Sequence, residues 1–189
     1  MSHFQSRATR RQVAISLVGL ALLLAGAFPA AAAAASPVTP LCDGKAATIV
    51  GKPGEVAIPG TQGPDVIVAL EAGVRIDGRG GDDTICAGPG DNIINGGAGN
   101  DWIDGGDGAN TIALGAGDNT AFAGPGNDTI LGGTGSDTVY AGDGYNLVST
   151  GAGNDFIVTG AGDDRIDGAK GTDTCDGGGG SNYVGHCEG

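Results

Sequence analysis

The chain has 189 residues, among them 40 Gly, 22 Asp or Glu and only nine Lys or Arg, which gives a net charge of −13. Nucleic acids and anionic membranes are negatively charged, so an acidic chain binds neither without a bridging cation. The charge is instead of the right sign for binding a divalent metal ion.

Residues 1–35 are typical of a secretory signal peptide. Three arginines lie in the first eleven residues, an apolar run extends from Val13 to Phe28, and small residues follow it. This order of segments favours export and cleavage near Ala33–Ala35. The apolar run is short for a membrane span, so we expect a secreted protein that keeps no span. Loss of the leader leaves six cations against 22 acids, a charge of −16.

The rest of the chain is dominated by a nine-residue repeat. Twelve units follow one another without insertion from Gly78 to Gly185, and the unit Gly96–Asp104 reads GGAGNDWID. In all twelve, the fourth position is Gly, the sixth is Asp or Asn, and the eighth is Ile, Val, Ala or Cys. Four looser units upstream, starting with Cys42–Val50, keep the apolar eighth position but mostly lose the acid, giving about sixteen units. End repeats commonly diverge because they cap the stack.

These regularities divide the mature chain into three segments. We expect an N-terminal cap with divergent repeats at 36–59, a repeat domain at 60–185 and a short C-terminal tail at 186–189. Within each unit only the residues around position eight are strand-like, and the glycines before them permit a turn. A chain that turns every nine residues in one sense winds into parallel coils, two units per coil. The sequence therefore predicts an all-β parallel β-roll.

The repeat resembles GGxGxDxUx, the calcium-binding nonapeptide of the RTX (repeats-in-toxin) family. The resemblance implies that Ca²⁺ lies between adjacent coils, held by the Asp residues of two stacked turns and by carbonyls of the glycine-rich turns. The toxin and hydrolase activities of long RTX proteins are not expected here, because the sequence contains no segment resembling those domains. Only the fold and calcium binding carry over.

Two units per coil sort the sixth positions into two columns. One column reads Asp65, Asp83, Asp101, Asn119, Asp137, Asp155, Asp173, and the other Asn92, Asn110, Asp128, Asn146, Asp164, Asn182. The resemblance makes every Asp in both columns a candidate calcium ligand. The first column has four stacked Asp pairs, interrupted at Asn119, and should form a calcium-rich edge. For the second column, a ladder of Asn amides that needs no metal is the preferred interpretation.

Calcium suits such ligands because it accepts six to eight hard oxygens in a flexible geometry, whereas magnesium requires a tighter octahedron. Zinc prefers His or Cys ligands, and the chain has only two histidines. Stacked acids repel one another until a cation binds, so we expect folding and calcium binding to be coupled.

Four cysteines, Cys42, Cys86, Cys175 and Cys187, lie after the leader. An even number in an exported protein favours two disulfides, and three pairings are possible. We favour Cys42 with Cys86 and Cys175 with Cys187, because each bond would then staple one end of the roll. An unpaired Cys175 filling an inward apolar position is the alternative.

Outward positions of one column carry a stripe of apolar side chains: Trp102, Phe122, Tyr140, Phe156 and Val158. Such a stripe can mark a face for self-association or an unknown ligand, although packing against the N-terminal segment or scattered exposure is the simpler interpretation. The sequence shows no catalytic motif, and its paired acids recur as repeat elements, so we expect no enzyme. The rival hypothesis is a calcium-independent adhesive solenoid that uses this stripe.

Overall fold

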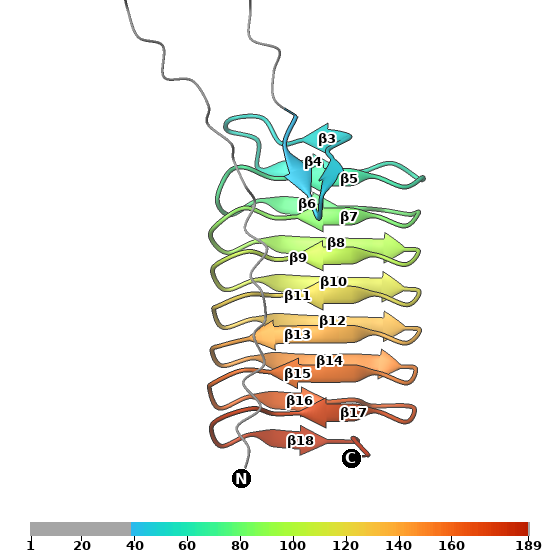
Figure 1. Cartoon of the computed structure of the whole chain (residues 1–189), viewed down its shortest axis with the longest axis vertical. Coiled ribbons are helices and arrows are strands. Elements are labelled where there is room, and N and C mark those ends of the chain that lie inside the picture. The colour runs from blue at the N-terminus through green and yellow to red at the C-terminus, as the bar shows by residue number, and fades with distance from the viewer. Residues whose placement is uncertain (1–38, 189) are drawn as a thin grey trace, which may run out of the picture.

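The computed structural model describes residues 39–188, and these form a long, narrow roll of parallel coils with a hairpin beside one end (Figure 1). Two parallel eight-stranded sheets face each other, and the chain crosses from one sheet to the other after every strand. The predicted signal peptide at 1–35 lies outside the described residues.

The first sheet, called the odd sheet, contains β3 (Ile49–Val50), β5 (Val66–Val68), β7 (Thr84–Cys86), β9 (Trp102–Asp104), β11 (Thr120–Phe122), β13 (Thr138–Gly142), β15 (Phe156–Thr159) and β17 (Thr174–Asp176). The second, the even sheet, contains β4 (Ala57–Pro59), β6 (Arg75–Asp77), β8 (Ile93–Ala98), β10 (Thr111–Ala116), β12 (Thr129–Thr134), β14 (Leu147–Ala152), β16 (Arg165–Asp167) and β18 (Tyr183–Gly185).

Each coil contains two units, as predicted. In the odd sheet Ile85 lies opposite Ile103, and in the even sheet Ile94 lies opposite Ile112, a step of 18 residues in both. The all-β parallel roll expected from the sequence is confirmed, with eight coils formed by the two sheets.

The core consists mainly of two rows of eighth-position side chains, one from each sheet, together with first-position residues such as Leu114, Ala123 and Ala141. Most strands bury their middle residue and expose or half-bury the residues on either side. Ile67, Ile85, Ile103 and Ile157 are fully buried from the odd sheet, and the even sheet contributes an equivalent row. Because the core is narrow, each coil buries little apolar surface to offset the loss of backbone entropy when that coil folds.

Glycine at the fourth position allows the coils to stack closely. Gly99 has φ +128°, and a Cβ there would lie 2.6 Å from the carbonyl carbon of Gly81 in the preceding coil. Both the dihedral angle and the clash exclude other residues.

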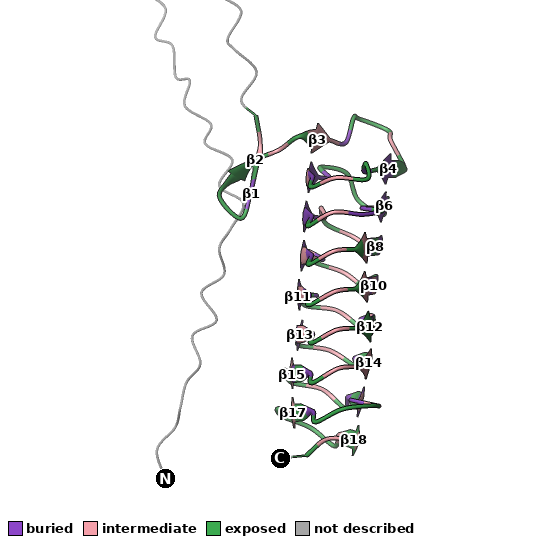
Figure 2. Ribbon diagram, turned by 90° about the vertical axis from the view of Figure 1, so that its right-hand side faces the viewer, coloured by how far each residue is buried: buried purple, intermediate pink, exposed green. Residues whose placement is uncertain are grey.

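The N-terminal cap differs from a further coil. β1 (Leu41–Cys42) and β2 (Lys45–Ala46) form an antiparallel hairpin beside the odd sheet (Figure 2), so of the unit Cys42–Val50 only its last two residues enter the roll. Cys42 is bonded to Cys86 and is buried with it and Val68. The hairpin is therefore fixed to the outer face of the odd sheet.

The opposite end is closed by the bond between Cys175 and Cys187, whose Cα atoms are 5.8 Å apart. Both side chains pack against the end of the core. The favoured disulfide pairing is thus the observed one, and the alternative of an unpaired Cys175 is wrong.

Candidate metal centres

The sixth-position side chains form a ladder along each long edge of the roll. The backbone N–H of Asp83 donates to Oδ1 of Asp101 (2.9 Å), and that of Asn92 donates to Oδ1 of Asn110 (3.0 Å), each one coil further on. Twelve such bonds of 2.7–3.0 Å connect the coils. We call the turns that lead into the odd sheet the odd edge, and those that lead into the even sheet the even edge.

An Asn in this ladder uses its second terminal atom as a donor. Nδ2 of Asn92 donates to the carbonyls of Gly88, Gly90 and, one coil further on, Gly105, at 2.8–3.2 Å. Nδ2 of Asn110 donates to Gly108 and Ala123 in the same way. The Asn Nδ2 atom is thus surrounded by backbone carbonyls. Two are those of positions two and four of its own turn, and the third is that of position one in the next coil. An Asn at position six therefore has hydrogen-bond partners for its side-chain amide without any ligand.

An Asp has an oxygen where Asn has its amide nitrogen, and an oxygen cannot donate to those carbonyls. Seven Asp Oδ2 atoms are buried and have no hydrogen-bond partner among the described residues: Asp83, Asp101, Asp128, Asp137, Asp155, Asp164 and Asp173. Burying an unpaired carboxylate oxygen among carbonyl oxygens is costly unless a cation or a proton lies between them.

The crowding of oxygens is clearest at Gly96. A Cβ at this first position would lie 2.5 Å from Oδ2 of Asp101 and 2.5 Å from the carbonyl oxygen of Leu114 in the next coil. No group of three or more His, Cys, Asp or Glu side chains is gathered for a metal within residues 39–188. A cation here would be bound by one or two carboxylates with backbone carbonyls, which are the hard oxygen ligands that calcium accepts.

Burial also favours the protonated form of these acids. Desolvation raises the pKa of Asp83, Asp101, Asp128 and Asp137 to about 6, and the neighbouring carboxylates Asp101 and Asp65 contribute at Asp83. Without a cation, these carboxylates are held in a site that disfavours their charge.

The structure stacks the four predicted Asp pairs of the odd edge as successive rungs. At the interruption, Nδ2 of Asn119 donates to the carbonyl of Gly117 and to Oδ1 of Asp137, both at 2.9 Å. Asp65 differs from the other acids, because its Oδ2 already accepts bonds from the N–H and hydroxyl of Thr61. On the even edge, Asp128 and Asp164 each lie between Asn rungs.

Two features of the edges were missed by the sequence analysis. On the even edge, the Asn side chains do not hydrogen-bond to one another. The Oδ1 atom of each accepts from a backbone N–H, and its Nδ2 donates to backbone carbonyls. A second, exposed ladder also connects fifth positions: Asn100 N–H donates to Asp82 Oδ1, and Asp118 N–H donates to Asn100 Oδ1, both at 2.8 Å. The frequent Asp, Asn and Ser at position five were the signal for it.

The apolar stripe lies on the outer face of the odd sheet, where its rings pack on one another. The ring centroids of Phe122 and Tyr140 are 5.0 Å apart and nearly parallel, with Trp102 and Phe156 continuing the row on either side. Trp102 also packs against the cluster around the Cys42–Cys86 bond. The N-terminal end of the stripe is therefore partly covered by the hairpin.

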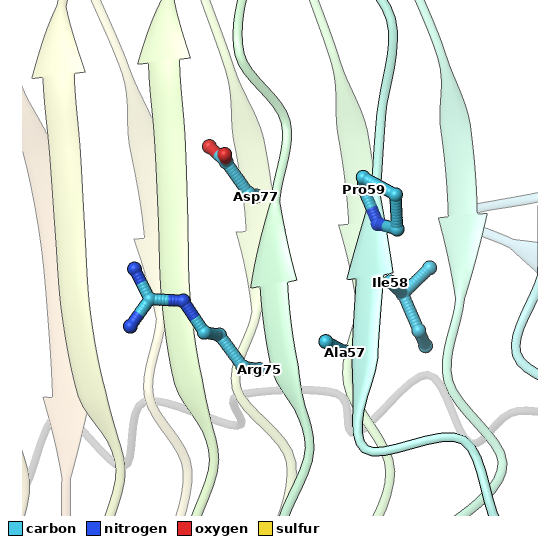
Figure 3. A pocket seen from close by; sticks show the side chains of 5 residues that line it. All are labelled: Ala57, Ile58, Pro59, Arg75 and Asp77. Carbon is cyan, nitrogen blue, oxygen red and sulfur yellow. The ribbon is translucent and has the colours of Figure 1, made fainter.

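A shallow hollow on the even sheet is lined by Ala57, Ile58, Pro59, Arg75 and Asp77 (Figure 3). At the other end, Nδ1 of the exposed His186 lies 2.7 Å from Oδ1 of Asp167, and this contact lowers the pKa of Asp167. Neither place gathers the groups of an active site. No helix in the described part of the chain is long and apolar enough to cross a membrane.

Comparison with known proteins agrees with this geometry. The RTX calcium-binding nonapeptide repeat family matches in four copies, at residues 59–94, 87–121, 114–148 and 149–184. No curated protein and no solved structure matches significantly.

Proposed function

Because the chain belongs to the RTX calcium-binding nonapeptide repeat family, we propose that it is a secreted calcium-binding protein whose roll folds around Ca²⁺ held between stacked turns. One observation carries the proposal. Seven buried Asp Oδ2 atoms stand without partners in the position where Asn residues donate an amide to turn carbonyls. A bound cation supplies the positive charge that these turns lack.

The ligand chemistry favours calcium among divalent ions. Each Asp turn except that of Asp65 offers one unpaired carboxylate oxygen among the described residues, at the place where an Asn turn holds carbonyls from two successive coils, and calcium tolerates such an irregular set. We assign the main row of sites to the odd edge, at Asp83, Asp101, Asp137, Asp155 and Asp173, with Asp65 at its end. Asp128 and Asp164 provide isolated sites on the even edge.

We expect calcium binding to be coupled to folding because the core of the roll is narrow. Each coil orders 18 residues at about 1 to 2 kcal/mol of backbone entropy per residue, and it buries few side chains in return. Ligand bonds to calcium would stabilise only the folded state, so binding and folding should form one transition. Extracellular calcium modules commonly have dissociation constants of about 0.1 to 1 mM, which would favour folding after export.

The rival function, a calcium-independent adhesive solenoid, is supported by the exposed rings of Phe122, Tyr140 and Phe156. Their mutual stacking leaves fewer ring faces for a partner. A binding or structural role fits both hypotheses.

A calcium titration of the mature chain, followed by far-ultraviolet circular dichroism with magnesium as the control ion, tests the proposal. We expect a cooperative coil-to-β transition with calcium alone, at higher calcium in Asp155→Ala, which loses both carboxylate oxygens. Asp155→Asn, which keeps Oδ1 and restores a donor, should need less calcium to fold than Asp155→Ala. Full β structure in chelator, unchanged by calcium and by both substitutions, would refute calcium-coupled folding and favour the adhesive solenoid.

A further inference from the structure

The first and sixth positions of a turn contact each other, which makes the residue at position one part of each candidate centre. On the odd edge, a Cβ at Gly168 would lie 2.6 Å from Oδ2 of Asp173. On the even edge, a Cβ at Gly177 would lie 2.9 Å from Nδ2 of Asn182. At these two turns, a Cβ at position one would therefore lie close to the second terminal atom of the sixth-position residue.

Two turns carry a threonine at position one, and their hydroxyls differ. Thr150 Oγ1 donates to the carbonyl of Gly168 at 3.2 Å. Thr159, one coil before Gly177, is only 4 % exposed, and its Oγ1 has no hydrogen-bond partner among the described residues. The carbonyl of Gly177, equivalent to the one that Thr150 uses, already accepts from Nδ2 of Asn182. Thr159 thus has a buried hydroxyl that makes no hydrogen bond with any described residue.

The sixth position of the same turn is Asp164, whose Oδ2 is also buried and unpaired. Its Oδ1 accepts from the N–H of Asn146 at 2.8 Å, and its own N–H donates to Oδ1 of Asn182 at 2.7 Å. Both neighbouring rungs are neutral amides, so no second carboxylate is stacked on this one. In the Asn92 turn, the second terminal atom contacts the carbonyls of Gly88 and Gly90, and the residues at those two positions of the Asp164 turn are Gly160 and Gly162.

The strand pairing is also irregular at this turn. In the odd sheet the register shifts between Tyr140 and Gly142, so that Gly142 lies opposite Thr159. The threonine therefore stands where the backbone departs from the regular stacking.

We propose that Thr159 and Asp164 form a separate cation site on the even edge, in which the threonine hydroxyl takes the place of the second carboxylate of a stacked pair. The inference rests on the proposed calcium binding and adds a ligand that the nonapeptide pattern, with glycine at position one, does not contain. The hydroxyl oxygen, the carboxylate Oδ2 and the turn carbonyls make an all-oxygen set suited to Ca²⁺.

The chain contains a matched comparison. Asp128, on the same edge, also lies between two Asn rungs and also has an unpaired Oδ2, but its first position is Ala123. The two turns differ in the hydroxyl at position one, so the Asp164 turn should bind calcium more tightly than the Asp128 turn.

The test is to count calcium ions bound per folded chain, and their affinities, by equilibrium dialysis and isothermal titration calorimetry. Thr159→Val keeps the branched shape and removes the hydroxyl. We expect it to weaken one ion at least tenfold and leave the others unchanged. Thr159→Ser should retain that ion, and Asp164→Asn should lose it. Ala123→Thr should strengthen one further ion, because it adds the hydroxyl to the Asp128 turn.

A purely structural role for Thr159 predicts a different result. Valine would then remove an unsatisfied buried hydroxyl, raise the stability of the protein both with and without calcium, and leave the number and affinity of bound ions as in wild type; that outcome overturns the proposal. Equal weakening by Thr159→Ser and Thr159→Val would overturn it as well. If wild type binds no calcium at all, the proposed function itself fails, which is distinguishable from loss of this one site.

Discussion

The backbone N–H of Asp155 donates a 2.9 Å hydrogen bond to Oδ1 of Asp173, while Oδ2 of Asp173 is buried and has no hydrogen-bond partner within residues 39–188. The Asp173 carboxylate therefore connects two coils through Oδ1, while its Oδ2 has no positively charged or donating group beside it among the described residues. Where Asn occupies the position, the first role is kept and the second group becomes a donor. Under the proposed function, the choice between Asp and Asn at position six separates turns that would bind a cation from turns that would not.

Exchanging this residue in a metal-free turn should create a requirement for calcium. Asn110→Asp replaces an amide that donates to Gly108 and Ala123 by an oxygen that cannot donate. At a calcium concentration just sufficient to fold wild type, we expect the variant to lose about 1 to 3 kcal/mol of unfolding free energy, and saturating calcium to recover part of the loss. Urea unfolding at low and at saturating calcium measures both. Equal stability of variant and wild type at low calcium would contradict this role of the amide.

The metal-free roll should be more stable in acid. Burial raises the pKa of Asp83, Asp101, Asp128 and Asp137 from 3.8 to about 6, so between these values the folded chain binds more protons than the unfolded chain. Its unfolding free energy is therefore highest below about pH 4 and falls as the pH rises through about 6.

Saturating calcium should reverse this pH dependence, because protons and calcium compete for the same oxygens. The β content measured by circular dichroism from pH 4 to 8, with chelator and with calcium, checks both directions, since the metal-free chain is expected to be a coil near pH 7 and to gain structure only in acid. A metal-free roll whose stability rises across this range would show that burial does not penalise these carboxylates.

The glycines at position four should differ in their tolerance of a side chain. Gly99 combines φ +128° with a blocked Cβ position, so Gly99→Ala should cost more than about 2 kcal/mol of unfolding free energy. Gly63 occupies the same position in an upstream unit, but a Cβ there meets nothing within 4 Å. Gly63→Ala should leave stability within about 0.5 kcal/mol of wild type. Denaturant unfolding in saturating calcium compares them, and equal costs would contradict the close stacking.

The two disulfides should stabilise the ends unequally. The bond between Cys42 and Cys86 spans 44 residues, and that between Cys175 and Cys187 spans 12. Restriction of the unfolded chain predicts contributions of about 4 and about 3 kcal/mol respectively. Replacing each pair by serine and measuring unfolding in calcium tests the order. A larger loss from the C-terminal pair would show that capping of the core outweighs chain entropy there.

The periodicity alone predicted the class of fold, and for most residues it predicted which residue of the next coil lies opposite. A period of nine with glycine at position four fixes where the chain turns, so Ile85 and Ile103 must stack once two units complete a coil. The same count brought Asp137, Asp155 and Asp173 into one column. The N-terminal hairpin was not predicted, because residues 41–46 leave the repeat and their position depends on the bond from Cys42 to Cys86.

The sequence by itself determined the coil, its inward row and the two columns of Asp and Asn, because these follow from local turn geometry repeated at a constant interval. Only the tertiary structure decided what each terminal atom of those side chains faces. Oδ1 meets an N–H of the preceding coil, and the second atom meets carbonyls from its own turn and the next. Those contacts join residues from 2 to 18 positions apart, and a hydrogen bond depends on donor and acceptor geometry that no spacing specifies.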